Sequence, residues 1–359
     1  MGLFQKDKLK FWFGLLVGVG FLYLTFRGQE LDKIGDALGK ANYWWLIPAL
    51  LVYFLGVFVR AIRWHYLLKP LQSIPVSRLY PVVVVGYMAN NVLPVRMGEV
   101  VRAYILDRRE HLSKTRSLAT IVVERIMDGI TMLLFIAIAS FSVNLTGDIA
   151  GIERVAGAVF LLGIVVFLFL ASNRRLLLAV ERFVLKLLPG KIRPKLEGLA
   201  DRFIDGLQVL RQWRDLLAVF ALSILAWACE GAMYWFVALT FSELSLSFTA
   251  IILTLAVANL FTLVPSTPGY FGPFDFAAKQ VLVGIFLIPA NLAASYVILL
   301  HAALYFPVTL LGLYYWLKEH LSLKEAERER KLLEDEKKHF AHQDLLQPDA
   351  IEVTPTRNK

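Results

Sequence analysis

The side chains with the clearest potential for chemistry are charged residues that interrupt long apolar runs. A charge at the centre of a membrane-inserted helix costs roughly 2.5–3.5 kcal/mol, so each such residue is a functional candidate. Arg96, Glu99 and Arg102 lie together in NNVLPVRMGEVVRAYIL, residues 90–106. If a helix begins at residue 97, Glu99 and Arg102 share a face, and free backbone N–H groups lie beside Arg96. Arginine and such amides bind phosphate oxygens, so the pattern predicts an anion site. The alternative is an internal Arg–Glu pair that only fixes the local fold.

A second charged group follows in VVERIMDGI. Glu124 and Asp128 are four residues apart and therefore project from one face of a helix. Two carboxylates at this depth need cations, and Arg96, Arg102 and Arg125 are the obvious suppliers. The two groups together predict a buried polar network that lines the inner side of a cavity. For Arg125 alone, a side chain that reaches out to the membrane interface is the alternative.

A third set of charges lies in the second half of the chain, at Glu230, Asp275, Lys279 and His301. Glu230 is the most isolated, so we expect it to be protonated or to relay a proton. His301 is expected to be a hydrogen-bonded packing residue and not a ligand. The intramembrane polar network expected from the sequence comprises Asn91, Glu124, Asp128, Glu230 and Asp275.

The composition excludes a soluble enzyme. Of 359 residues, 57% are hydrophobic and only 19% are charged, and the mean hydropathy is +0.59, whereas soluble domains carry about 25% charge. The net charge of +9 points to cytoplasmic loops and not to nucleic acid. The one cysteine, Cys229, excludes an intrachain disulfide. We find no motif for a metal, a nucleotide or another cofactor, and we expect no catalytic activity.

Eight apolar blocks predict an all-α polytopic membrane protein. Six of them are read as full crossings: 11–26, 43–59, 118–143, 155–172, 216–241 and 292–317. The other two, 79–107 and 249–288, are broken in the middle, and their arms are short for a membrane span of about 20 residues. Proline and glycine break helices and permit reversals, and they stand here at Pro94, Gly98, Pro265, Pro268, Gly269 and Gly272. We therefore expect two re-entrant helical hairpins.

The distribution of basic residues supports this topology. With both termini in the cytoplasm, the hairpin model puts the basic segments 1–10, 60–78, 108–117 and 173–214 on the cytoplasmic side. The two halves then have opposite orientations, which is the inverted repeat common among secondary transporters. Residues 1–317 form the expected membrane domain. Within it, 173–214 is amphipathic and lies on the membrane surface or packs on helix ends, and 318–359 is a charged cytoplasmic tail.

Three segments carry a family resemblance. NNVLPVRMGEVVRAYIL (90–106), ERIMDG (124–129) and PSTPGYFGPFD (265–275) resemble the flippase-like family, the transmembrane domain of lysylphosphatidylglycerol synthases. Members with a synthase domain move an aminoacylated phospholipid to the outer leaflet. This chain is similar to stand-alone members, which are associated with glycolipid, hopanoid or polyprenyl-linked pathways. The family motifs carry over onto Asn91, Pro94, Arg96, Gly98, Glu99, Arg102, Glu124, Arg125, Asp128, Pro268, Gly269 and Gly272.

Residues and resemblance together predict a lipid translocase of the cytoplasmic (inner) membrane. A phosphate-bearing headgroup is expected at Arg96, Glu99, Arg102 and Arg125, with membrane lipids as the partners. One alternative is an ion-coupled carrier of a small anionic solute, with Glu230 or Asp128 as its proton site. Another is a non-catalytic membrane partner of an enzyme that makes envelope glycolipids or polyprenyl-linked lipids. A membrane-embedded enzyme is the last alternative.

Overall fold

The computed structural model describes residues 3–93, 97–140 and 213–318, and within these ranges the chain is helical without a strand. The elements are α1 (Leu3–Phe26), α2 (Leu31–Gly39), the short 3-10 helix η1 (Tyr43–Trp45), α3 (Leu46–Leu68), α4 (Val76–Val92), α5 (Gly98–Glu110), α6 (Lys114–Ser140), α10 (Trp213–Ala238), α11 (Phe248–Phe261), the 3-10 helix η3 (Pro268–Tyr270), α12 (Pro273–Gly284) and α13 (Ala290–Lys318). Pro94, Arg96, the expected crossing at 155–172, nearly all of the amphipathic segment 173–214 and the tail after Lys318 lie outside the described residues.

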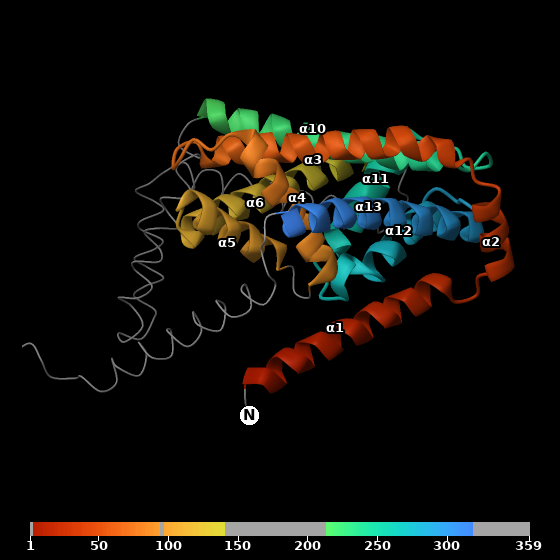
Figure 1. Cartoon of the computed structure of the whole chain (residues 1–359). Helices are drawn as coiled ribbons and strands as arrows, with labels where there is room; N and C mark the ends of the chain where they lie inside the picture. Colours follow the sequence, from red (N-terminus) through yellow and green to blue (C-terminus); the bar gives the residue numbers. More distant parts are fainter. Residues whose placement is uncertain (1–2, 94–96, 141–212, 319–359) are drawn as a thin grey trace, which may run out of the picture.

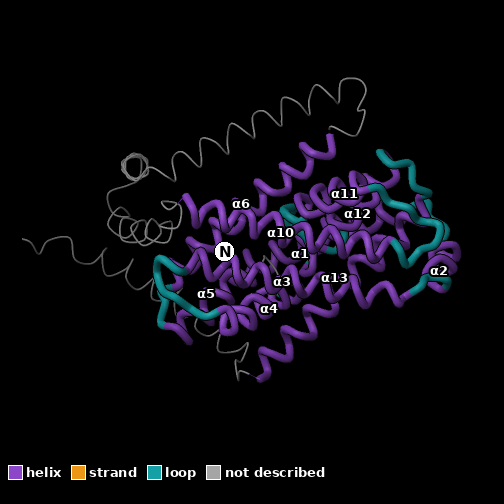
Figure 2. Tube along the Cα trace, turned by 90° about the horizontal axis from the view of Figure 1, so that it is seen from above, coloured by secondary structure: helices purple, strands orange, loops and turns teal. Residues whose placement is uncertain are grey.

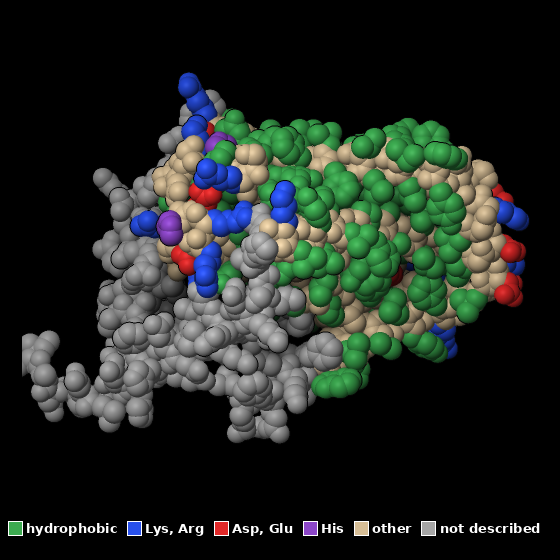
Figure 3. Space-filling view, viewed as in Figure 1, with side chains coloured by type: hydrophobic (Ala, Val, Ile, Leu, Met, Phe, Trp, Pro, Cys, Tyr) green, Lys and Arg blue, Asp and Glu red, His purple; other side chains and the backbone are tan. Residues whose placement is uncertain are grey.

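Length and composition identify three membrane-spanning candidates in the described ranges. Tyr43–Leu68, Arg214–Ala238 and Ala290–Lys318 are each long and apolar enough to cross a bilayer. Helix α6 has 27 residues, but its apolar sequence is interrupted by charges. Apolar side chains cover the middle of the face seen in Figure 3, and charged side chains gather towards its two ends. The chain is therefore built for a membrane, while six crossings remain a prediction.

Helices α3 and α10 form the closest pair in the bundle and run antiparallel (Figure 1). Trp45 at the start of α3 stacks on Phe236 near the end of α10 at 6.1 Å. Near the other end of the pair, Arg63 contacts Ser223 at 2.8 Å. Gly56 permits this approach, since a Cβ there would lie 3.0 Å from the Cβ of Cys229.

The expected end of this crossing at residue 59 is wrong. Helix α3 continues to Leu68, so the first nine residues of the expected cytoplasmic segment 60–78 belong to the helix. The apolar residues Trp64, Leu67 and Leu68 are fully buried, and their burial stabilises the added turns.

Helices α4 and α5 form an antiparallel hairpin. Near its tip, the backbone N–H of Gly98 donates to the side chain of Asn90 at 2.7 Å. At its open end, Arg78 lies 3.3 Å from Glu110. Helix α4 ends and α5 begins inside the break expected at 90–99. The re-entry of this hairpin into the membrane stays a prediction.

Helices α11 and α12 form the second pair of short helices, and they pack against each other. The segment between them holds Gly269 at φ 75° and Gly272 at φ 99°. These positive values favour glycine, which explains why this break, expected at 264–275, is glycine-rich. Helix α12 then begins at Pro273, whose missing N–H is tolerated in a first turn.

The packing of the two halves follows one pattern. Helix α4 packs on α13, where Tyr80 meets Tyr315 and Asn91 donates to Thr309 at 2.8 Å. In the same way, α11 packs on α6. Each helix of the first half has a counterpart in the second half: α3 corresponds to α10, α4 to α11, α5 to α12 and α6 to α13. When each helix is exchanged for its counterpart, the main contacts between helices are the same. Figure 2 shows that most of the loops lie towards the two ends of this bundle.

Helix α1 runs along the outside of the bundle and contacts the segment between α11 and α12. A Cβ at Gly14 would lie 2.9 Å from the carbonyl oxygen of Ser266, and one at Gly18 would lie 3.1 Å from that of Phe271. Small residues four apart on a helix allow another segment to approach closely, and here the two glycines admit the backbone of this segment.

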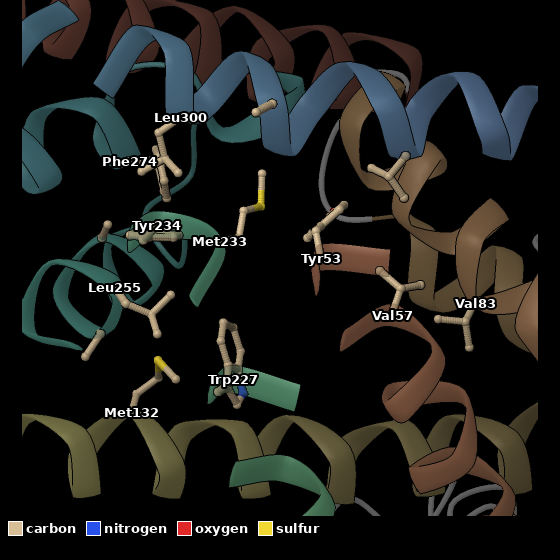
Figure 4. Packing of buried hydrophobic residues seen from close by; sticks show 14 of the residues in the cluster. Tyr53, Val57, Val83, Met132, Trp227, Met233, Tyr234, Leu255, Phe274 and Leu300 are labelled. Atoms are coloured by element: carbon tan, nitrogen blue, oxygen red, sulfur yellow. The ribbon is translucent and has the colours of Figure 1, made fainter. Parts of the chain in front are cut away.

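The interior is shared by helices of both halves (Figure 4). Tyr53 and Val57 from α3 lie near Trp227 and Met233 from α10, and Leu300 of α13 closes one side. Any charged group within this interior needs a partner, because an isolated charge in an apolar medium is strongly unfavourable.

The Gly98→Ala substitution tests the packing of the first hairpin. A Cβ at residue 98 would overlap with the carbonyl oxygen of Gly86 and the side chain of Asn90. We expect a loss of about 1–3 kcal/mol of stability, as for other overpacked sites. Thermal unfolding in detergent measures it. The control is Gly129→Ala on α6, where a Cβ meets nothing within 4 Å and better helix propensity should stabilise slightly. Equal midpoints for the two variants would refute the tight contact.

Candidate functional site

A network of buried arginines and carboxylates joins α3, α5, α6 and α10. Arg102 on α5 donates both terminal nitrogens to the two oxygens of Glu124, each at 2.9 Å. Arg63 on α3 lies 2.5 Å from Asp128 and 3.3 Å from Glu124. The indole N–H of Trp227 on α10 also donates to Asp128 at 2.8 Å. The expected pairing of Glu124 and Asp128 with arginine is therefore present.

Arg125 connects the two carboxylates of α6. Its Nη2 lies 2.6 Å from Glu124 and its Nη1 lies 3.5 Å from Asp128. The side chain is 38% exposed, whereas that of Arg63 is fully buried. Arg125 is thus a network arginine that a ligand can also reach.

Glu230 is not isolated, which corrects the sequence-based expectation. The Arg60 guanidinium on α3 lies 2.7 Å from its carboxylate and 4.6 Å from the ring centre of Trp227. Asn259 at the end of α11 donates to the second oxygen of Glu230 at 3.4 Å. Glu230 is therefore one partner of a buried Arg–Glu pair and not an isolated carboxylate.

Arg60 and Arg63 are network residues that sequence reasoning missed. They follow directly after the apolar block 43–59 and were assigned to the cytoplasmic segment. One signal could have found them, because that block is shorter than the approximately 20 residues of a span. A helix extended to that length would have included both arginines in the span.

Among the described residues of this region, opposite charges are equal in number. The described residues place four arginines and four carboxylates in it: Arg60, Arg63, Arg102, Arg125, Glu99, Glu124, Asp128 and Glu230. Ion pairs join seven of these residues, all but Glu99, and lower the cost of burying them, since each of these seven charges finds an opposite charge.

A small pocket lies beside the network, between α4, α5 and α6, and its accessible volume of about 10 Å³ is roughly the space for one water molecule. It is lined by Val83, Gly86, Tyr87, Asn90, Glu99, Arg102 and Arg125. Among the residues that the structure describes, Oε2 of Glu99 is buried without a hydrogen-bond partner. A buried carboxylate oxygen needs a donor, from water or from a ligand. The pocket therefore offers an acceptor at Glu99 and a cationic donor at Arg125.

The expected headgroup residues divide into three groups. Glu99 and Arg125 line the pocket with capacity to bind a ligand. Arg102 also lines it, but both of its terminal nitrogens already bind Glu124, so it positions the network and does not offer a free fork. The remaining one, Arg96, lies outside the described residues.

Two expected network members lie elsewhere. The Asn91 amide donates to Thr309 and to the carbonyl of Tyr305 on α13, at 2.8 Å and 3.3 Å. Asp275 accepts from the N–H of Gly272 at 2.8 Å and contacts His301 at 2.6 Å. Both ring nitrogens of His301 have partners, which confirms its expected hydrogen-bonded state. No group of three or more metal-ligating side chains occurs in the described ranges.

A double-mutant cycle on Arg60 and Glu230 tests the pairing of buried charge. Arg60→Met leaves Glu230 buried without its cation, which should cost about 3–5 kcal/mol, and Glu230→Leu should cost a similar amount. The double variant should lose far less than the sum. Denaturant unfolding in mild detergent measures each value.

The matched control is Arg78→Met. Arg78 also faces a carboxylate, Glu110, but its side chain is 64% exposed, so its loss should cost at most about 1 kcal/mol. Additive losses in the Arg60/Glu230 cycle, no larger than this control, would contradict the buried pair.

Comparison with known proteins places these features in a family. Residues 11–312 match the family described as the lysylphosphatidylglycerol synthase TM region. A UPF0104 membrane protein of Methanocaldococcus jannaschii is 26% identical over 314 residues, which cover 83% of this chain and 91% of that protein. One from Methanothermobacter thermautotrophicus is 25% identical over 321 residues, covering 85% and 92%. The glycosyltransferase AglD of Haloferax volcanii is 22% identical over 325 residues, which cover 80% of this chain and 51% of AglD.

The family match contains every arginine and carboxylate of the network and both pairs of short helices. The archaeal UPF0104 relatives are matched over nearly their whole length. The chain therefore belongs to the family of the lysylphosphatidylglycerol synthase TM region, as a membrane protein of the UPF0104 type.

Proposed function

We propose that this protein moves a phosphate-bearing lipid across the cytoplasmic membrane, and that the lipid headgroup binds at Glu99 and Arg125, two residues that line this pocket. One observation carries the proposal. A buried carboxylate oxygen without a partner lies in a pocket that an accessible arginine also lines, within an otherwise apolar bundle. A purely structural network would satisfy its own acceptors.

The two side chains define complementary parts of the headgroup. Arg125 presents a guanidinium, which binds phosphate oxygens. Glu99 accepts a hydrogen bond, so the headgroup carries a hydroxyl or amino donor next to its phosphate. The acyl chains stay in the bilayer while the head follows the polar side chains of the bundle. Arg102 and Arg63 hold Glu124 and Asp128 and keep the pocket in shape.

The proposed topology has six crossings, two re-entrant hairpins and an inverted repeat, with both termini in the cytoplasm. The exchange of contacts between α3–α6 and α10–α13 supports the repeat. The hairpin helices have 12 to 17 residues, or about 18–26 Å at 1.5 Å per residue, against a hydrocarbon core of about 30 Å. Arg78, Arg108, Arg109 and Lys114 lie at the ends of α4, α5 and α6, which favours that end as cytoplasmic.

The rival functions receive unequal support. An ion-coupled carrier with its proton site at Glu230 or Asp128 is disfavoured, because both carboxylates bind arginine. A membrane partner of a glycosyltransferase is favoured by one finding, the match to about half the length of AglD. Co-purification of a soluble enzyme from the native membrane would support that role. The described part of the site presents polar binding groups, and this favours transport.

The substitution Arg125→Gln tests the headgroup site. In proteoliposomes that contain phosphatidylglycerol with a fluorescent acyl chain, externally added dithionite bleaches only the outer leaflet. We expect the wild type to speed loss of the protected signal and the variant to fall to the rate of protein-free vesicles. The variant should fold, because Glu124 keeps Arg102 and Arg63, and Asp128 keeps Arg63.

Arg78→Gln is the control, since Arg78 is exposed and lies at the end of α4 away from the pocket. It should transfer lipid like the wild type. Full transfer by a folded Arg125→Gln protein would refute the site. A wild type no faster than protein-free vesicles, with phosphatidylglycerol and with a polyprenyl phosphate probe alike, would shift support to the glycosyltransferase partner.

A further inference from the structure

The pocket beside the network limits the size of the group that can enter it. Its space suits about one water molecule. Val83 and Gly86 of α4 line it together with the polar residues, and a Cβ at Gly86 would lie 2.6 Å from Cδ of Arg102. Helices α4 and α5 therefore pack closely here, and a headgroup can place only one small group in the pocket.

Asn90 of α4 supplies a hydrogen-bond donor to this pocket. Its side-chain oxygen accepts the backbone N–H of Gly98 at 2.7 Å. Because a backbone N–H can only donate, this contact fixes which end of the amide is the oxygen and which is the NH₂ group. In the part of the chain that the structure describes, the NH₂ group has no acceptor. Asn90 lines the pocket, so this donor is available to a ligand.

Glu99 of α5 supplies the matching acceptor. Its Oε2 is buried and has no hydrogen-bond partner among the described residues. An ionised carboxylate only accepts, whereas the NH₂ group of Asn90 only donates. The Tyr87 hydroxyl, which also lines the pocket, can do either and so does not discriminate. The pocket thus presents one fixed acceptor and one fixed donor to a single water-sized group.

A hydroxyl group matches this pair. It has the size of a water molecule, and it donates and accepts at the same time. A primary ammonium group would satisfy Glu99, but it has only donors, and it would face the NH₂ group of Asn90. It would also meet the guanidinium groups of Arg102 and Arg125, which line the same pocket. A trimethylammonium group is larger and has no N–H donor.

We propose that the pocket selects its lipid by one headgroup hydroxyl, which donates to Glu99 and accepts from Asn90, while the neighbouring phosphate binds the exposed part of Arg125. The substrates are then phospholipids with an alcohol headgroup, such as glycerol or a sugar. This inference rests on the proposed lipid transfer and deepens it, because it makes Asn90 the residue that distinguishes a hydroxyl from an amino group.

The first experiment compares four lipids with the same fluorescent acyl chain: phosphatidylglycerol, phosphatidylethanol, phosphatidylethanolamine and phosphatidylcholine. Phosphatidylethanol has the charge of phosphatidylglycerol but no headgroup hydroxyl. Each is placed in phosphatidylcholine vesicles with the wild-type protein, and the dithionite assay measures transfer above the protein-free rate. We expect phosphatidylglycerol to move about tenfold faster than phosphatidylethanol and phosphatidylethanolamine, because each of these leaves a polar group of the pocket unmatched. Phosphatidylcholine should stay at the protein-free rate.

The substitution Asn90→Asp tests the donor. It keeps an oxygen for the N–H of Gly98 and replaces the NH₂ group with a second acceptor. Two carboxylates then line the pocket and favour an ammonium group, so phosphatidylethanolamine should now move faster than phosphatidylglycerol. The control is Asn42→Asp, because the side-chain oxygen of Asn42 likewise accepts a backbone N–H, that of Trp44 at 3.2 Å, at an exposed position before α3. It should keep the wild-type order of lipids.

The outcomes separate this inference from the lipid transfer on which it rests. Equal transfer of phosphatidylglycerol and phosphatidylethanol by the wild type would overturn the hydroxyl site, and so would faster transfer of phosphatidylethanolamine. If Arg125→Gln still abolished that transfer, the proposed lipid transfer would stand. Transfer of none of the four lipids would refute both. The wild-type order decides by itself, so the test does not depend on the folding of Asn90→Asp.

Discussion

The structure depends on the pairing of charge inside an apolar bundle. Arg60 and Arg63 of α3 bind carboxylates on α10 and α6, and Arg102 of α5 binds Glu124 with both terminal nitrogens. Each of these groups would be very costly alone in this environment. The network therefore fixes how α3, α5, α6 and α10 meet, because a shift of any one helix would separate opposite charges. The close antiparallel contact of α3 and α10 at Gly56 is compatible with this register.

The pocket is a consequence of the same pairing. Glu124 and Asp128 bind Arg63 and Arg102 and also Arg125, whose side chain nevertheless stays 38% exposed. Glu99 keeps an oxygen that has no partner in the described part of the chain. The break between α4 and α5 then brings Asn90 and the amide of Gly98 to the same place. This arrangement places a cationic donor at Arg125 and an acceptor at Glu99 within one small volume.

The features predictable from the sequence are those that depend on local chemistry. The breaks within 90–99 and 264–275 follow from proline and glycine, and the shared face of Glu124 and Asp128 follows from their spacing. The pairing of Arg60 with Glu230 could not be predicted, because it needs the register between α3 and α10, which are 170 residues apart at this contact. The capture of Arg102 by Glu124, and not by its helix neighbour Glu99, likewise depends on the packing of α5 on α6.

The central claim is that Glu99 and Arg125 hold a lipid headgroup. Native mass spectrometry of the protein released from mild detergent, with identification of the retained lipid, tests it most directly. The account predicts that the wild type keeps a defined phosphate-bearing lipid with a hydroxyl or amino group, and that Glu99→Gln weakens this retention while Glu110→Gln, remote from the pocket, does not. Only bulk membrane lipid, retained equally by all three proteins, would contradict the account.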